Sequence, residues 1–433
     1  MSSRPASRTP SRSVSSELSP EEQEKAALVT AACHDHNLDA LVHLATTRLG
    51  LVTDPLRRTA WPLLLGCTDR ERDRERERHV DKDADDDAKP LPQPDHHEQA
   101  SWKGLLRHSD EEQVALDVNR AFVYYPKNES EKQLDRRKEE LSDVIIQVLR
   151  RHPSLCYFQG YHDIAQVLLL VLGPDDAPAA VARLSLLRIR DFMLSKLDPA
   201  MSQLELLRPL MAAADPVLYR HLPKHRPTFA LAGTITLFAH IIKEYRDIAR
   251  LFDFFLAQHT VIPIYFFAAI VLSRRDEILD IDEEDEDIMS AILGKLPEPF
   301  DLEFHIARAV ELYERLPPES LASWEWWRIS SSSVLKTSST PLQLSQTSLE
   351  EGEKLLQQQE KDIQRQKALE NAAVRAKMLR RNLWLYRRYS ATGVAVVIGV
   401  YALWLGRTHA RSAGLIALGP VGDLLRKVTG VVL

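Results

Sequence analysis

The chain has 433 residues, of which 44% are hydrophobic and 27% are charged, and its formal net charge is −6. This composition provides for a sizeable core in one or two domains, and it excludes the overall basic charge of many nucleic-acid-binding proteins. Three cysteines without a CxxC pair argue against a disulfide framework and against a cysteine-ligated zinc site. This use of cysteine indicates a body located in the cytosol. Since glycine and alternating β-branched runs are sparse, we expect that body to be all-α.

The first 19 residues are expected to form a tail. They are rich in Ser, Arg and Pro and contain no apolar run, which predicts disorder and excludes a secretory signal. Ser19 is followed by Pro20, Glu21 and Glu22, a pattern typical of a helix N-cap with acidic residues in the first turn. The folded part is therefore predicted to begin at residue 20.

Residues 69–94 differ sharply from their surroundings. They alternate acidic and basic side chains almost without interruption, and Val80 is the one large apolar residue within the run from 69 to 88. A segment of this kind cannot bury a core, so it predicts a disordered, solvated insertion in a surface loop.

From residue 101 to about residue 316, the apolar residues follow helical spacing. In 141–149 and again in 164–172 they recur at i, i+3, i+4, i+7 and i+8, which predicts two amphipathic helices. Further apolar helices are predicted over 229–242, 248–256 and 264–272. The uncharged run 260–273 is too short to cross a bilayer, and we assign it to the core.

The C-terminal part predicts four successive segments: a Ser/Thr-rich linker (329–348), an exposed polar helix (349–389), a transmembrane helix (390–406) and a short tail (407–433). Residues 390–406 carry no charge and would span about 25 Å as a helix, which suits a thin bilayer. Four arginines lie between 380 and 388, so the positive-inside rule predicts a single-pass protein with its N-terminal body in the cytosol. The endoplasmic reticulum is the expected membrane, and the Golgi is the alternative.

Searching for the sequence signatures of enzymes gives a negative result. The chain has no P-loop, no GxGxxG, no HExxH, no GxSxG and no paired-carboxylate motif. An active site for a reaction of the chain's own is therefore not visible in the sequence.

Two segments place polar residues in a largely apolar helical setting. In Val114–Phe122, Asp117 and Arg120 are three residues apart and would share one face of a helix. In Tyr157–Ile164, Gln159 and Gly160 precede a predicted buried helix, so Gln159 would be held at a junction between loop and helix. Taken alone, the first segment favours a structural ion pair between Asp117 and Arg120, and the second is a weak signal of function.

Together, and in this order, these motifs resemble the TBC-domain family of Rab GTPase-activating proteins. That family carries an R…W segment, then IxxDxxR, then YxQG, and this chain has Arg57 with Trp61, then Val114–Arg120, then Tyr157–Gly160. The resemblance covers about residues 50–316 and is assigned to a helical domain over 20–328, into which the charged segment is inserted. Val114 replaces the usual Ile, and Tyr161 stands where many members have Met. The Gln-Gly-Tyr-His-Asp form, with a hydrophobic segment near the C-terminus, resembles the branch anchored in the endoplasmic reticulum.

The resemblance implies a function that acts in trans. Arg120 and Gln159 would be the catalytic arginine and glutamine fingers supplied to a GTP-bound Rab-type GTPase, and Asp117, Tyr157 and Gly160 would support them. Arg57 and Trp61 would be structural. The chain would carry no cofactor and no metal, since GTP and Mg²⁺ belong to the partner, and it would be a GTPase activator without a reaction of its own. Its expected role is in vesicle traffic between endoplasmic reticulum and Golgi.

Two alternatives stay open from the sequence. The domain could be a non-catalytic Rab-binding scaffold, although such members often lack the Arg or the Gln, and both are present here. The chain could also be a membrane tether in which the long helix 349–388 is the working part. The sequence does not identify the Rab partner.

Overall fold

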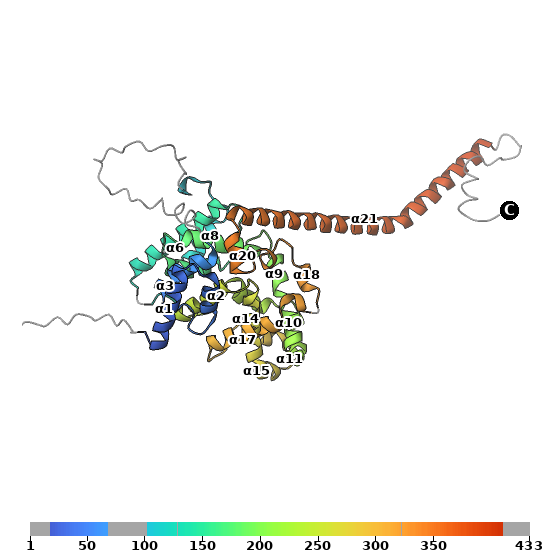
Figure 1. Ribbon diagram of the computed structural model, residues 1–433. Helices are drawn as coiled ribbons and strands as arrows, with labels where there is room; N and C mark the ends of the chain where they lie inside the picture. The colour runs from blue at the N-terminus through green and yellow to red at the C-terminus, as the bar shows by residue number, and fades with distance from the viewer. Residues whose placement is uncertain (1–17, 68–101, 128, 322, 410–433) are drawn as a thin grey trace, which may run out of the picture. The chain divides into compact units, whose positions relative to one another are not determined.

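Every regular element that the computed structural model describes is a helix, which confirms the predicted all-α class (Figure 1). The structure describes residues 18–67, 102–127, 129–321 and 323–409, except for the side chains of residues 370, 383, 385–392 and 405–409. The charged insertion at 69–94, the tail up to residue 17 and the C-terminal residues from 410 lie outside these ranges. The chain divides into two compact units, residues 1–363 and residues 364–433.

The helices that lead up to and include the two predicted motifs belong to the first unit. They are α1 (Pro20–His34), α2 (Leu38–Thr46), α3 (Asp54–Leu65), the short 3₁₀ helix η1 (Trp102–Gly104), α5 (Glu111–Val118), α6 (Glu131–Arg151), α7 (Tyr161–Leu172), α8 (Ala177–Leu187) and η2 (Arg190–Phe192).

The helices that follow complete the body of the first unit and lead into the C-terminal helix. They are α9 (Asp198–Leu204), α10 (Leu207–Ala214), α11 (Pro216–His221), η3 (Thr228–Ala230), α12 (Leu231–Ile235), α13 (Tyr245–Ala257), α14 (Ile262–Ser273), α15 (Arg275–Leu279), α16 (Glu286–Leu293), α17 (Leu302–Arg315), η4 (Pro318–Ser320), α18 (Glu325–Arg328), α19 (Val334–Thr337), α20 (Pro341–Gln346) and α21 (Leu349–His409).

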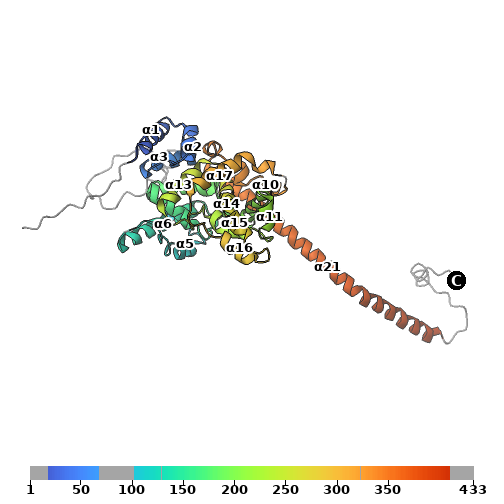
Figure 2. The same cartoon turned by 90° about the horizontal axis from the view of Figure 1, so that it is seen from below.

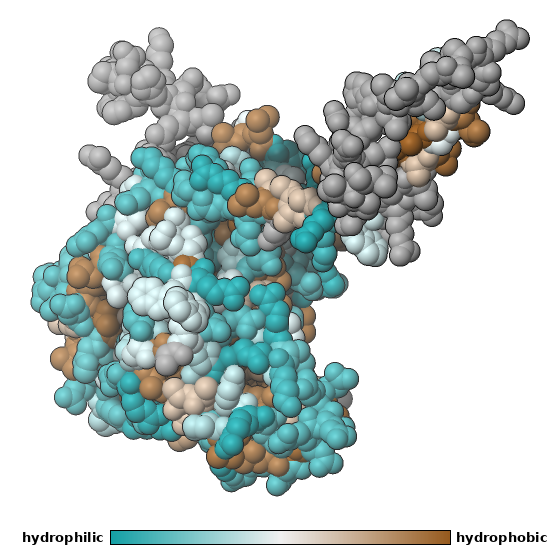
Figure 3. Space-filling model, turned by 90° about the vertical axis from the view of Figure 1, so that its right-hand side faces the viewer, coloured by the Kyte–Doolittle hydropathy of each residue, from teal (hydrophilic) through white to brown (hydrophobic). Residues whose placement is uncertain are grey.

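The core of the first unit is built around α14, which lies among the other helices in both ribbon views (Figure 1, Figure 2). All residues from Ile262 to Val271 are buried, as expected for a helix that is apolar on every side. α17 packs against it through Leu302, Ile306, Ala309 and Leu312, one apolar stripe at helical spacing. The prediction that the run 260–273 belongs to the core is confirmed. In Figure 3 the visible surface is mainly hydrophilic, with hydrophobic residues in small separate patches.

Local signals in the sequence explain where the helices flanking the Gln159 segment begin and end. α6 starts at a capping box formed by Ser130 and Gln133, and it buries its predicted apolar face. α7 begins after Gly160 and ends at Gly173, both of which have positive φ angles. Of these signals, Gly160 borders the loop between α6 and α7 and marks the point where α7 begins.

The predicted helix over 229–242 is wrong in its length. The structure has η3 and α12 only up to Ile235, and Leu237 and Phe238 then adopt φ angles of 48° and 63°. Apolar spacing alone did not reveal this break, because Leu237 and Phe238 are buried and therefore fit a helical pattern. The break matters for the site, since it turns Thr236 and His240 toward the start of α7.

The prediction that segment 329–348 is a linker is also wrong. The segment contains α19 and α20, and Val334, Leu335, Ser338 and Leu344 are all buried. Ser/Thr-rich composition is typical of linkers, but here the hydroxyl groups cap short helices and bond the body, as Ser333 does with Asp191.

The predicted exposed helix and transmembrane helix lie in one continuous helix, α21. Its first turns belong to the first unit and are not fully exposed, because Leu356 and Gln359 are buried. Among the residues described, no helix is long and apolar enough to cross a membrane.

Candidate functional site

Arg120 lies just beyond the C-terminal end of α5, and its guanidinium is at the surface. Its side chain is 70% exposed, whereas that of Asp117 is 2% exposed. Arg120 Nη2 donates a hydrogen bond to Asp117 Oδ1 over 2.7 Å. The buried carboxylate therefore holds one nitrogen of the guanidinium, while the arginine side chain as a whole stays largely exposed.

Gln159 occupies the loop between α6 and α7, and its side chain is exposed. The loop backbone is held before it, where the Cys156 amide donates to the Met193 carbonyl over 2.8 Å and the Tyr157 amide donates to Asp110 Oδ2 over 2.8 Å. Gln159 is thus an exposed side chain on a constrained backbone.

Gly160 fixes the loop on the other side of Gln159. Its φ angle is +97°, a conformation that residues with a Cβ seldom adopt, and a Cβ there would lie 2.5 Å from Thr236 Cγ2. Both the backbone angle and the close approach of Thr236 require glycine. The predicted supporting role of Gly160 therefore has a concrete geometric basis.

Tyr157 joins the two motifs. Its hydroxyl donates to Asp117 Oδ2 over 3.0 Å, so Asp117 contacts Arg120 with one oxygen and Tyr157 with the other. Burial, and then the Asp117 carboxylate, raise the pKa of the Tyr157 hydroxyl, which keeps it a neutral donor. Segments 40 residues apart in sequence are in this way linked through one buried carboxylate.

A second group of polar side chains extends this link, and the sequence did not identify its role. His162 Nδ1 lies 3.1 Å from the Tyr157 hydroxyl, His162 Nε2 lies 3.4 Å from Asp163 Oδ1, and His240 Nδ1 lies 2.9 Å from Asp163 Oδ2. His162 and Asp163 fall inside the motif that was singled out, but His240 is 77 residues from Asp163 and gave no signal.

The two histidines of this group have opposite charge preferences. Burial lowers the pKa of His162, although Asp163 and Asp117 oppose the effect. The hydrogen bond that the His240 ring makes to the Asp163 carboxylate raises the pKa of His240, whose side chain is 60% exposed. Relative to an ordinary imidazole, the surroundings therefore favour the neutral form of His162 and the charged form of His240.

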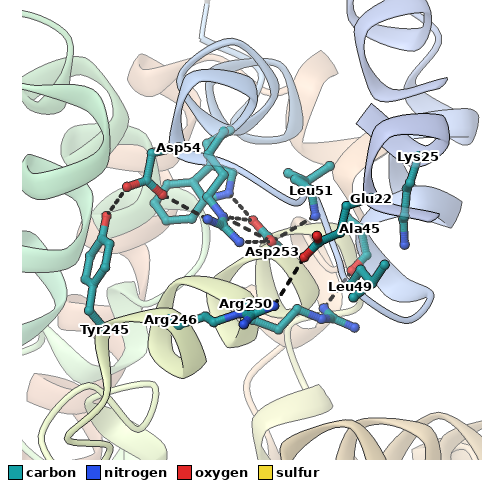
Figure 4. A network of polar contacts seen from close by, with 12 residues as sticks. Glu22, Lys25, Ala45, Leu49, Leu51, Asp54, Tyr245, Arg246, Arg250 and Asp253 are labelled. Carbon is teal, nitrogen blue, oxygen red and sulfur yellow. Dashed lines mark hydrogen bonds and ion pairs between the residues drawn. The ribbon is translucent and has the colours of Figure 1, made fainter. Parts of the chain in front are cut away.

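Arg57 and Trp61 lie in a different, buried network. Its acceptors Asp54 and Asp253 are labelled in Figure 4. Arg57 donates to Asp253 through Nε and Nη2 and to Asp54 through Nη1, and Trp61 Nε1 donates to Asp253 Oδ1 over 2.8 Å. The Leu51 amide also donates to Asp253. Each side-chain nitrogen of Arg57 and Trp61 donates to a carboxylate inside the protein, so the contacts tie α3 to α13 and agree with a structural role.

Metal chemistry has no visible basis in the part of the chain that the structure describes. No three His, Cys, Asp or Glu side chains there are arranged to hold a metal ion. What the site offers instead is a permanently charged planar donor, Arg120, and an amide that can donate and accept, Gln159, both exposed on an ordered framework.

Comparison with known proteins places the chain among GTPase activators. The profile of the Rab-GTPase-TBC domain family matches residues 54–279. TBC1 domain family member 20 of Bos taurus is 35% identical over 305 residues, which cover 69% of each chain. GTPase-activating protein gyp10 of Schizosaccharomyces pombe is 30% identical over 314 residues, 72% of this chain and 77% of the relative.

A solved structure resembles the fold. The crystal structure of the Ypt/Rab-GAP domain of Gyp1p matches with a TM-score of 0.51 over 68% of this chain and 99% of that domain. The sequence identity in this match is 14%, so it supports the fold alone.

Proposed function

This chain belongs to the Rab-GTPase-TBC domain family and activates GTP hydrolysis by a Rab-type GTPase, and we propose that it does so by supplying Arg120 and Gln159. The observation that carries the proposal is the Asp117 carboxylate, which contacts both Arg120 and the Tyr157 of the Gln159 loop. One buried group thus holds one nitrogen of the Arg120 guanidinium and, through Tyr157, the loop that carries Gln159. Arg120 and Gln159 would reach the nucleotide from one docked surface.

Arg120 suits the charge that develops during phosphoryl transfer. The transition state is loose and spreads negative charge over the phosphoryl oxygens, so positioning and electrostatics supply most of the catalysis. A guanidinium remains charged at any physiological pH and presents a planar fork that matches phosphate oxygens. Asp117 holds the fork through Nη2, and the exposed remainder of the group is available to the partner.

Gln159 suits the positioning of the attacking water. Its carboxamide accepts a hydrogen bond from a water molecule and donates another, so it would hold that molecule in line with the bond to be broken. The loop that carries it is fixed by Gly160 on one side and by the Cys156 and Tyr157 amides on the other. A preorganised loop lowers the entropy lost on reaching the reactive geometry.

We also propose that the chain acts at a membrane of the early secretory pathway, with the body in the cytosol. The support is the uncharged sequence 390–406 and the exposed apolar side chains within it, Val394, Val396, Val397, Val400, Leu403 and Trp404. Extraction of membranes with alkaline carbonate tests this: the full chain should stay in the pellet, and a chain ending at residue 389 should be released. Equal release of both would refute it.

The catalytic proposal is tested with a set of purified Rab proteins loaded with GTP. Phosphate release is measured in single turnover with and without the full chain. We expect strong acceleration for one Rab or a small group. A scaffold would bind a Rab and leave its hydrolysis rate unchanged, and that result for every Rab would overturn the proposal.

A further inference from the structure

The segment after the expected domain end at residue 328 is bonded into the first unit by buried arginines. Arg183 Nη2 donates to the carbonyls of Leu344 and Thr347, at 2.6 and 3.0 Å. Arg190 Nη2 donates to the Ser332 carbonyl over 2.5 Å. Both arginines are almost fully buried, so loss of the segment would leave charged donors without these acceptors.

Asp191, next to Arg190 in η2, receives bonds from the same segment and from α21. Ser333 Oγ donates to its Oδ2 over 2.5 Å, and Gln359 Nε2 donates to its Oδ1 over 2.9 Å. Gln359 Oε1 in turn accepts from Arg190 Nε over 3.0 Å. A single buried amide on α21 therefore makes a hydrogen bond to each charged residue of η2.

The start of α21 approaches α8 closely enough to exclude a side chain. A Cβ added to Gly352 would lie 2.8 Å from Leu187 Cδ2 and 3.2 Å from Leu186 Cβ. Glycine at this position lets the helix lie directly on the end of α8, and Leu356 is fully buried one turn later. The first turns of α21 are thus packed as a core element is packed.

From this position α21 contacts the segments that hold the Gln159 loop. Glu353 Oε1 lies 2.5 Å from His152 Nδ1, at the end of α6 and seven residues before Gln159. Glu360 Oε1 accepts from Ser195 Oγ over 2.7 Å. Ser195 lies two residues after Met193, whose carbonyl accepts a hydrogen bond from the Cys156 amide.

Aromatic packing gives a second path from α21 to the loop. Phe192 of η2 meets Phe158 edge to face, with ring centroids 6.2 Å apart, and Phe158 immediately precedes Gln159. η2 is the element whose Arg190 and Asp191 are held by Gln359. The loop is therefore supported at His152, at Cys156 and at Phe158 by elements that α21 fixes.

We propose that residues 329–363 are part of the catalytic unit, and that the first turns of α21 brace the Gln159 loop, with Glu353 and Glu360 as positioning residues. The inference rests on the proposed role of Gln159. It assigns a function to a helix whose sequence indicated only an exposed spacer. It also means that a fragment ending at residue 328 lacks the support of the loop that carries its glutamine finger.

The test compares three double variants of the full chain. Glu353→Ala/Glu360→Ala removes both contacts, and Glu353→Gln/Glu360→Gln keeps an acceptor oxygen at each position. Glu351→Ala/Gln357→Ala is the matched control, because both residues lie on the exposed face of the same turns. We expect the first variant to lower the maximal single-turnover rate by about 10- to 100-fold at unchanged half-saturating concentration, since small misplacements of catalytic groups have large effects.

A second readout is independent of GTPase activation. In hydrogen–deuterium exchange, the peptide containing the Cys156 and Tyr157 amides should exchange about tenfold faster in the Ala/Ala variant than in the control. The Gln/Gln variant should stay near wild type in both measurements. Unchanged exchange in the Ala/Ala variant would overturn the brace. Faster exchange with a wild-type chain that activates no Rab would instead leave the brace standing and overturn the proposed function.

Discussion

Two arginine–aspartate pairs in this protein have the same chemistry but different roles. In the Arg57–Asp253 pair the side chains are 6% and 0% exposed, and Arg57 bonds carboxylates through Nε, Nη1 and Nη2. In the Arg120–Asp117 pair only the aspartate is buried, and Arg120, 70% exposed, bonds it through Nη2. The first pair completes its bonding inside the fold, and the second directs a charge outward.

The difference explains which arginine can serve a partner. Burial alone would lower the pKa of Arg57, but Asp253 and Asp54 outweigh it and raise the pKa, so that guanidinium is charged and fully engaged. Removing one member of such a pair leaves a buried charge without its partner. Arg120 is largely exposed, and without it Asp117 would still accept hydrogen bonds from Gln113 and Tyr157, so we expect Arg120 to contribute little to folding.

The largest expected effect is a loss of stimulated GTP hydrolysis when Arg120 is replaced, which distinguishes the two pairs by function. Arg120→Ala should reduce the stimulated rate of GTP hydrolysis by about 10³- to 10⁵-fold, the contribution of an arginine finger to phosphoryl transfer. The melting temperature and the binding of the GTP-bound Rab should change little. Single-turnover phosphate release and a thermal melt measure both quantities.

Arg120→Lys is the informative companion to this variant. Lysine keeps the charge but lacks the planar fork, so we expect it to be almost as inactive as alanine. A chain that keeps most of its activity with alanine at position 120 would show that Arg120 is not the finger.

Arg57→Ala should show the reverse pattern, a loss of stability. Breaking a buried ion pair costs about 3–5 kcal/mol, because Asp253 would stay buried without its main counter-charge. Urea denaturation followed by circular dichroism measures the change. If Arg57→Ala keeps the wild-type midpoint and loses only GTPase activation, Arg57 belongs to the catalytic site and the distinction between the pairs fails.

Gly160→Ala should lower both stability and activity by a smaller amount. Positive φ in a residue with a Cβ costs on the order of 1–3 kcal/mol, and the new Cβ would also meet Thr236 Cγ2 at 2.5 Å. Thr236→Ser removes that methyl group, so adding it to Gly160→Ala should restore part of the loss.

Gly173→Ala provides the matched control at the other end of α7. It also has a positive φ, of 80°, but nothing lies within 4 Å of the added Cβ. We therefore expect a loss of stability there with the rate of stimulated hydrolysis unchanged. Equal effects of both substitutions on that rate would indicate that the close approach of Thr236 does not position Gln159.

The smallest expected effect concerns His240. Its pKa is raised by the hydrogen bond to Asp163, so its protonated form stabilises the folded state below a pH of about 6.5, and this contribution is lost as pH rises through the raised pKa. An NMR titration should place the His240 midpoint above the ordinary value. Asp163→Asn should move it down, and an unchanged midpoint would mean that the pair does not form in solution.

The sequence indicated the exposed pair and its loop because their residues are close along the chain. Asp117 and Arg120 are three residues apart, and Tyr157, Gln159 and Gly160 also lie within three positions of one another, so each group forms a short motif. Helix periodicity likewise gave α6 and α7, and an uninterrupted apolar run gave α14, which is buried on every side.

The features that the sequence did not predict depend on contacts between residues far apart along the chain. Asp253 lies 196 residues from Arg57, and His240 lies 77 residues from Asp163, so neither partner could be paired by spacing. The segment 329–348 has the composition of a linker, and only the buried Arg183 and Arg190 reveal why it is fixed. The left-handed backbone conformation of Leu237 and Phe238 cannot be predicted from apolar periodicity, because both residues are buried although the helix has ended before them.

The central claim, that Arg120 and Gln159 act in trans, is tested most directly with a Rab whose own switch glutamine is replaced by alanine. Single-turnover hydrolysis is measured with the wild-type chain and with Gln159→Ala. We predict that the wild-type chain still stimulates this Rab, because Gln159 positions the water, and that Gln159→Ala abolishes the stimulation. Complete resistance of the altered Rab to the wild-type chain, or full activity of Gln159→Ala, would contradict the account.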